Sequence, residues 1–154
     1  MSPVLLIASD HGGFVLKEKL KIYLLKRGVR VKDLGTFSEE RCDYPLQAAE
    51  LAGLISRRSY KRGILICKSG IGNSIVANRF PGVRAALCYN ERAAMLSREH
   101  NDSNVLVMGD SFVTEKQAEK MTDIWLKTAF AGGRHKRRLK LIREIEKKLC
   151  GDEK

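Results

Sequence analysis

The stretch Gly-Ile-Leu-Ile-Cys-Lys-Ser-Gly-Ile-Gly-Asn-Ser at residues 63–74 decides how this chain is interpreted. Residues 63–66 form an apolar run of the kind found in strands that are buried on both faces of a parallel sheet. Cys67 falls where that strand is predicted to end. Gly70 and Gly72 leave the backbone free to turn tightly and to approach a ligand closely. The stretch therefore predicts a buried strand followed by a tight loop that a ligand can approach.

A short helix is expected after this loop, over residues 75–79, with Asn73 or Ser74 as its cap. Its free N–H groups would point into the loop, where negative charge can sit or develop. In open α/β sheets, ligands bind at the carboxyl ends of the strands. Cys67 is thus a candidate reactive thiol, although a free cysteine in an apolar strand is more often a small core residue.

Length and composition limit the class of protein. With 154 residues, 44% of them apolar, the chain fits one globular domain over residues 1–154. The first apolar run, residues 4–8, is too short to span a membrane. The four cysteines show no C-x-x-C pair and no metal-like spacing: Cys42, Cys67, Cys88 and Cys150. We expect reduced thiols, a cytoplasmic location, no membrane partner and no metal site.

The formal charge of +11 is partly concentrated near the C-terminus, where residues 134–140 include six basic residues, one of them a histidine. We expect a basic helix over about residues 134–150. Arg134 and Arg138 lie four residues apart, so they share a helix face that either binds a phosphate group or is simply solvated. An aromatic content of 6% and the lack of a recognised nucleic-acid module argue against nucleic-acid binding as the main function.

Apolar runs and amphipathic segments alternate along the whole chain. The expected strands cover residues 4–8, 29–31, 63–66, 83–88 and 104–108, and the expected helices cover residues 14–27, 46–58, 75–79, 90–98, 114–130 and 134–150. Such alternation predicts an α/β fold, a three-layer α/β/α Rossmann-like domain with a five-stranded parallel sheet.

Polar side chains gather at the ends of the predicted strands. Those that follow the first three strands are Asp10, His11, Tyr44, Cys67 and Ser69. His100 and Asn101 precede the fifth strand instead, at the opposite end of the sheet. One chain would then not bring His100 to Cys67, whereas the second subunit of a symmetric dimer could. Purely structural roles also exist: a cap for Asp10, a solvated turn for His11, a packing anchor for Tyr44 and a helix end for His100 and Asn101.

Three stretches carry a family resemblance: residues 9–13 (Ser-Asp-His-Gly-Gly), 64–72 (Ile-Leu-Ile-Cys-Lys-Ser-Gly-Ile-Gly) and 97–102 (Ser-Arg-Glu-His-Asn-Asp). Together with Asp-Tyr-Pro at 43–45, Ala-Asn-Arg at 77–79 and Gly-Gly-Arg-His at 132–135, they closely resemble the type B ribose-5-phosphate isomerases. That superfamily also contains hexose-phosphate isomerases. The likeness runs from residue 4 to about residue 150, with the motifs in family order.

The resemblance implies a homodimer with two shared active sites, with a tetramer left open, and no metal or organic cofactor. It also implies interconversion of ribose 5-phosphate and ribulose 5-phosphate in the pentose phosphate pathway. By position, Cys67 resembles the base, and His100 with Asp10 resembles the pair that opens the sugar ring. Ser69 stands where the family commonly has a threonine, whose hydroxyl assists at the substrate oxygens. Asn101 and Tyr44 resemble sugar contacts, and His11, Arg134 and Arg138 resemble phosphate contacts. The remaining implied substrate contacts are Ser9 and the loop residues Lys68, Gly70, Ile71, Gly72, Asn73 and Ser74, whose amides resemble an oxyanion hole.

Three positions depart from the family pattern. Lys68 replaces the usual glycine after the cysteine, and Ser111 stands where many relatives have an arginine that helps to hold the phosphate. Asn73 stands where a separate branch has a glutamate base, which places this chain with the cysteine branch. A thiol must ionise to act as a base, and we expect the helix N-terminus and Lys68 to lower the pKa of Cys67.

Two other functions compete with this interpretation. The same reaction on a hexose 6-phosphate, of the allose or galactose type, differs only in the size of the pocket. A non-catalytic binder of sugar phosphate or nucleic acid is a different class, and the presence of Cys67, Ser69 and His100 argues against it.

Overall fold

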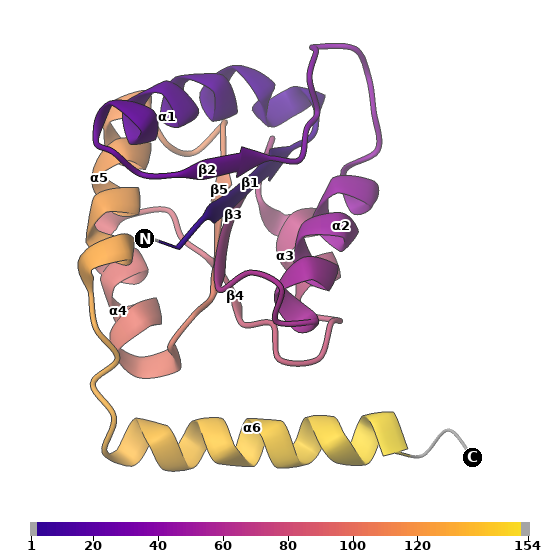
Figure 1. Ribbon diagram of the computed structural model, residues 1–154, viewed down its shortest axis with the longest axis vertical. Coiled ribbons are helices and arrows are strands. Elements are labelled where there is room, and N and C mark those ends of the chain that lie inside the picture. The colour runs from indigo at the N-terminus through magenta and orange to yellow at the C-terminus, as the bar shows by residue number, and fades with distance from the viewer. Residues whose placement is uncertain (1–2, 152–154) are drawn as a thin grey trace.

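Five parallel strands form one sheet with the order β2-β1-β3-β5-β4 in the computed structural model, which describes residues 3–151 (Figure 1). The strands are β1 (Leu5–Ser9), β2 (Val31–Asp33), β3 (Arg62–Cys67), β4 (Ala85–Leu87) and β5 (Val105–Gly109). Every neighbouring pair is parallel, so all carboxyl ends meet at one edge of the sheet. The five-stranded parallel α/β architecture expected from the sequence is confirmed.

Helices cover both faces of the sheet. They are η1 (His11–Gly13), α1 (Phe14–Lys26), α2 (Tyr44–Ser56), α3 (Ile71–Ala77), α4 (Glu91–Asn101), α5 (Glu115–Lys127) and α6 (Arg134–Gly151). Figure 1 shows α1, α4 and α5 on one side and α2 and α3 on the other. Because side chains alternate along a strand, β1 contributes Leu5 and Ile7 to the core under α1, and Leu6 and Ala8 to the core under α2.

Some element boundaries differ from the sequence expectation. α2 begins at Tyr44, two residues early, because Pro45 suits the first turn of a helix. Tyr44 therefore lies on a helix and not in a loop. α3 begins at Ile71, with Gly70 as its cap, so the expected cap residues Asn73 and Ser74 lie within the first turns. The predicted capping box of Thr114 with Gln117 is confirmed.

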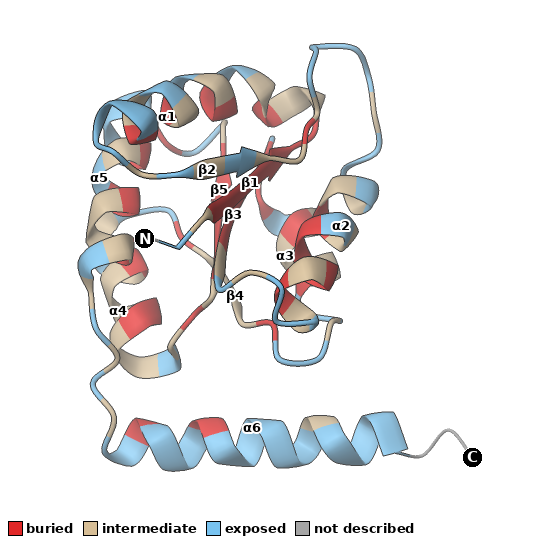
Figure 2. Cartoon of the chain, viewed as in Figure 1, coloured by how far each residue is buried: buried red, intermediate tan, exposed pale blue. Residues whose placement is uncertain are grey.

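α6 lies beyond the two helical layers and meets α4 near its start (Figures 1 and 2). Its first turns are anchored by the buried side chains of His135 and Leu139. Farther along, Leu141, Ile145 and Leu149 are 48%, 58% and 73% exposed at a spacing of four residues, which aligns them on one face. The helix thus presents an apolar stripe that its own chain does not cover. No helix within residues 3–151 has the length and apolar character that crossing a membrane requires.

A buried lysine ties α1 to β2. The side chain of Lys17 is fully buried, and its Nζ lies 2.6 Å from Asp33 Oδ2 and 2.8 Å from Glu18 Oε1. Lys21 joins the same two carboxylates at 2.8 and 2.7 Å. Burial alone would raise the pKa of Asp33, but the hydrogen bonds from Lys17 and Lys21 outweigh it and lower that pKa. The network is therefore stabilising while Asp33 is ionised.

Replacement of this carboxylate tests the network. We expect Asp33→Asn to lower the free energy of unfolding at pH 7 by about 3 kcal/mol, because the buried ammonium of Lys17 loses its closest partner. Since the pKa of Asp33 is lowered in the folded state, its contribution is present above the unfolded value of about 3.9 and is lost as pH falls through the folded value. Urea unfolding at pH 7 and pH 3 measures this. The difference between wild type and variant should shrink at pH 3, and Glu50→Gln, an exposed carboxylate, should stay within about 0.5 kcal/mol of wild type.

Candidate functional site

Cys67 is the last residue of β3, at the carboxyl edge of the sheet. Its side chain is buried, at 4% exposure, because β1 and β5 flank β3 on both sides. The chain then turns back over the thiol, and the backbone N–H of Gly70 donates to Cys67 Sγ at 3.1 Å. The thiol is therefore enclosed by the loop that follows it, with a backbone donor directed at its sulfur.

Two opposing effects act on the pKa of Cys67. Burial is the larger, and it raises the pKa of the thiol above its ordinary value. Backbone N–H groups of Gly70, Asn73 and Ser69 lower it, and the nearby charge of Asp10 raises it further. The expectation that Lys68 lowers this pKa has no support, because Lys68 Nζ is paired with Asp110 Oδ2 at 3.2 Å. The helix N-terminus acts as expected, but within one chain it does not outweigh burial.

The loop after Cys67 can take this path only with glycine at two positions. Gly70 has a φ of +82°, and a Cβ there would lie 2.5 Å from Leu87 Cδ1. A Cβ on Gly72 would lie 2.4 Å from the ring of Tyr44. The first turn of α2 thus packs its tyrosine directly against the loop. Tyr44 is 38% exposed, so one side of the ring remains open to a ligand.

Two hydroxyl groups lie along the same loop. Ser69 Oγ accepts a hydrogen bond from the backbone N–H of Ile71 at 3.2 Å, which leaves its own proton available to a second partner. Ser74 Oγ donates to the carbonyl of Ile71 at 2.7 Å. Of these two loop hydroxyl groups, that of Ser69 is therefore the one with a proton free to donate.

The turn after β1 forms the neighbouring wall. Asp10 is buried at 6% exposure and accepts from the backbone N–H of Gly13 at 3.0 Å, so the capping role expected for it is real. His11 Nδ1 lies 3.2 Å from the backbone nitrogen of Cys42, which donates to it, and 3.1 Å from the carbonyl oxygen of the same residue. His11 thereby joins the turn to the segment before α2, and it is not merely a solvated turn residue.

Two buried polar side chains at this edge lack hydrogen-bond partners among residues 3–151. They are the hydroxyl of Ser9 and the carboxamide of Asn73, whose oxygen and nitrogen are both unpaired. Both residues are at most 1% exposed. Because buried polar groups are nearly always hydrogen-bonded, these two groups are candidates for contact with the polar atoms of a ligand.

The other predicted site residues form a separate group. His100 and Asn101 end α4, and Arg134 and Arg138 begin α6 with exposed side chains. The ring of His100 stacks on that of His135, with centroids 4.2 Å apart and an interplanar angle of 12°. Burial, followed by the charge of His100, lowers the pKa of His135.

These two groups lie at opposite edges of the sheet. Cys67 pairs with Gly109, the last residue of β5, whereas His100 precedes Val105, which pairs with Gly63. Gly63 and Cys67 are four steps apart along the extended strand, or roughly 13 Å at 3.3 Å per residue. As the order of the sequence predicts, one chain therefore does not bring His100 close to Cys67. It does not bring His100 close to Asp10 either.

Sequence reasoning missed several residues of these groups. His135 lies in a basic run in which only Arg134 and Arg138 are predicted to have a role, so its stacking on His100 is not foreseen. Asp110 follows β5 directly, and this position at a strand end was the available signal for its pairing with Lys68. Ser111 is exposed, and its backbone N–H donates to the carbonyl of Lys68 at 2.9 Å, so the two departures from the family pattern are neighbours. No group of three or more potential metal ligands is found within residues 3–151.

Comparison with known proteins identifies the family of this chain. The ribose/galactose isomerase family model matches residues 5–142. The chain is 45% identical to ribose-5-phosphate isomerase B of Escherichia coli over 139 residues, which is 90% of this chain and 93% of that protein.

Solved structures give the same result. Ribose-5-phosphate isomerase B of Clostridium thermocellum is 46% identical, with a TM-score of 0.92 over 95% of this chain and 99% of that chain. The Mycoplasma genitalium ribose-5-phosphate isomerase B with bound ribulose-5-phosphate is 40% identical, with a TM-score of 0.91 over 96% of this chain and 98% of that chain. Sequence and structure therefore agree that this chain belongs to the ribose/galactose isomerase family.

Proposed function

We propose that the protein interconverts ribose 5-phosphate and ribulose 5-phosphate, with Cys67 as the base. The observation that carries the proposal is the thiol at the end of β3, which is buried and receives backbone N–H groups on its sulfur. Removal of a proton from a carbon beside a carbonyl needs a positioned base of this kind. Relatives named as ribose-5-phosphate isomerase B support the choice of substrate.

The reaction needs the transfer of two protons. The Cys67 thiolate takes the proton from C2 of the open-chain aldose, and the electron pair left behind forms an enediolate. The thiol then returns its proton to C1, while a proton moves from O2 to O1 to complete the ketose. The hydroxyl of Ser69 has an available proton for the substrate oxygens.

The developing negative charge needs hydrogen-bond donors that are already in place. The loop from Lys68 to Ser74 leads into α3, whose first turn offers backbone N–H groups for this role, while those of Gly70 and Ile71 already donate to Cys67 Sγ and Ser69 Oγ. The buried, unpaired side chains of Ser9 and Asn73 supply further polar contacts. Their satisfaction by substrate would offset the cost of leaving them without partners in the free protein.

A second copy of the chain would complete the site. His100, which we assign to ring opening with Asp10, and Asn101, which we assign to the sugar, lie too far from Cys67 in one chain. Arg134 and Arg138 are exposed at the start of α6 and suit a phosphate group. The uncovered apolar stripe of Leu141, Ile145 and Leu149 supports a homodimer in which α6 packs on the partner. All four cysteines are free, which supports the proposed cytoplasmic location.

A coupled assay with ribose 5-phosphate, allose 6-phosphate and galactose 6-phosphate side by side tests the proposal. We expect the value of kcat/KM to be highest for ribose 5-phosphate by at least tenfold. A preference for either hexose phosphate would move the assignment to the other isomerases of this superfamily. Lack of turnover of all three compounds would leave only a binding role.

Replacement of the proposed base gives a sharper result. We expect Cys67→Ala to lower kcat by about 10²–10⁴-fold, the usual contribution of a general base. Binding of ribose 5-phosphate, measured by calorimetry, should persist, because the phosphate and sugar contacts are untouched. Stability should fall by less than about 1.5 kcal/mol.

Cys88→Ala is the matched control. Cys88 is also buried, and burial raises its pKa to about 11, but it follows β4 and lies outside the loop of residues 67–74. This variant should keep kcat within about twofold of wild type. If Cys67→Ala keeps more than about a tenth of the wild-type kcat, another group is the base.

Mixing experiments test the shared site. Cys67→Ala and His100→Ala homodimers should each be nearly inactive, because each site lacks one group. After subunit exchange, one of the two sites of each heterodimer has both groups intact. Each heterodimer should therefore have about half the activity of a wild-type dimer. Mass spectrometry of the intact complex confirms that heterodimers have formed. Heterodimers without activity would place each complete site within one chain.

A further inference from the structure

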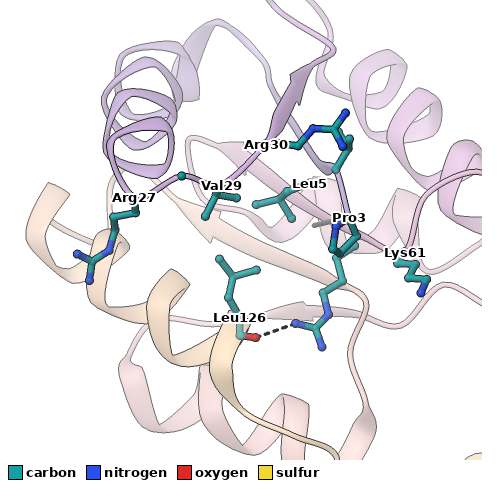
Figure 3. Close-up of a pocket in the computed structure, with 10 residues that line it drawn as sticks. Pro3, Leu5, Arg27, Val29, Arg30, Lys61 and Leu126 are labelled. Atoms are coloured by element: carbon teal, nitrogen blue, oxygen red, sulfur yellow. Dashed lines mark hydrogen bonds between the residues drawn. The ribbon is translucent and has the colours of Figure 1, made fainter. Parts of the chain in front are cut away.

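Two cavities lie at the amino-terminal edge of the sheet, at the opposite end from Cys67. The first has a volume of about 470 Å³ and lies between the ends of α1 and α5 and the start of β1 (Figure 3). The second has a volume of about 510 Å³ and lies between the start of β3, the end of α2 and the end of α4. Both are lined by Lys61 and Arg62, so they are neighbours across this segment of chain.

The two cavities differ in their lining. In Figure 3, Leu5, Val29 and Leu126 form the apolar wall of the first cavity, with basic side chains around it. The second cavity is lined by six cationic side chains and a single carboxylate. They are Arg58, Lys61, Arg62, Arg84, Arg98 and Arg143, with Asp102 as the acid. We call this second cavity the arginine cavity.

The carboxylate of Asp102 already forms two ion pairs. Asp102 pairs with Arg84 at 3.2 Å and with Arg98 at 2.8 Å. Within residues 3–151, Lys61, Arg62 and Arg143 have no carboxylate within 4 Å. Arg58 lacks such a carboxylate as well, so four of the six cations of the arginine cavity have no ion-pair partner in the described part of the chain.

Arg62 is the central case. Its guanidinium donates to the carbonyl of Leu126 at 2.9 Å, the dashed line in Figure 3, and lies 5.5 Å from the centre of the Trp125 ring. Burial, followed by the positive charge of Arg98, lowers its pKa. An arginine carries five N–H donors, so most of those of Arg62 remain for another acceptor. A bound anion would supply both the acceptors and the missing negative charge.

We propose that the arginine cavity binds an oligophosphate anion. Lys61 and Arg62, which line both cavities, would hold its phosphate groups. The number of cations exceeds what one phosphate needs, and arginine forks match phosphate oxygens in pairs. The source is either an inorganic polyphosphate or the phosphate chain of a nucleotide. In the second case the adjacent apolar cavity takes the nucleoside. None of the residues assigned to the isomerase site lines either cavity, so this site is separate from the proposed reaction.

Calorimetry on the full chain in about 0.15 M salt tests the proposal, with sodium tripolyphosphate and ATP as the two probes. We expect one equivalent to bind per chain in the presence of saturating ribose 5-phosphate. Lys61→Met and Arg62→Met should each weaken binding at least tenfold. Lys61 is exposed and forms no hydrogen bond or ion pair within residues 3–151, so that variant remains informative if Arg62→Met is unstable. Lys120→Met, which removes the same charge from an exposed site on α5, should bind within twofold of wild type.

The two probes distinguish the sources. Binding of ATP at least tenfold tighter than tripolyphosphate assigns a nucleotide, and equal affinity assigns the inorganic chain. Three results would overturn the proposal: binding of neither probe, competition by ribose 5-phosphate, or affinities that Lys61→Met leaves unchanged. Binding of a short DNA duplex through these residues, without binding of either probe, would replace it with a nucleic-acid surface.

Discussion

The close packing of one loop against its neighbours sets the character of the carboxyl edge. Residues 67–74 fold back over the strand that precedes them, and they do so because Gly70 and Gly72 have no Cβ where Leu87 and Tyr44 approach. This packing buries the thiol and also turns the backbone N–H groups of Gly70 and Asn73 toward it. Burial and hydrogen bonding therefore cannot be separated at this site, since the same backbone path produces both. Larger side chains at either glycine would displace the loop and with it the donors.

The balance of charge around Cys67 is unfinished in a single chain. Burial raises the pKa of the thiol. The charge of Lys68, the next residue in the chain, is balanced by its ion pair with Asp110. A base that works near neutral pH needs a lower pKa than burial alone allows. In the homodimer that we propose, the exposed arginines at the start of the partner's α6 would bring positive charge to this edge. The positive charge that would lower the pKa of Cys67 and the missing catalytic groups would then both come from the partner subunit.

The direction of a parallel sheet separates two kinds of chemistry in this molecule. The carboxyl ends of the strands hold the thiol of Cys67, the hydroxyl of Ser69 and the carboxylate of Asp10. The amino ends are instead surrounded by arginine side chains. The high net charge is thus not spread evenly over the surface. Arg62 and Arg84 lie partly buried at the amino-terminal edge, where desolvation and neighbouring cations lower their pKa values. Such an arrangement is costly in an empty cavity and becomes favourable when an anion shares it.

Local signals in the sequence were enough to predict the sheet, the alternation of helices and the position of the thiol. Apolar runs, glycine stops and the capping box at Thr114 act over a few residues, so they can be recognised without knowledge of the fold. The cap of α3 was misplaced, because the left-handed backbone at Gly70 depends on packing against β4 and β5. The burial of Lys17 could not be predicted either, since its partner Asp33 arrives from another strand. Likewise, only the tertiary structure pairs His100 with His135 and gathers the arginines of the amino-terminal edge. These contacts join residues far apart in the chain, and no local pattern specifies which distant side chain will occupy a given space.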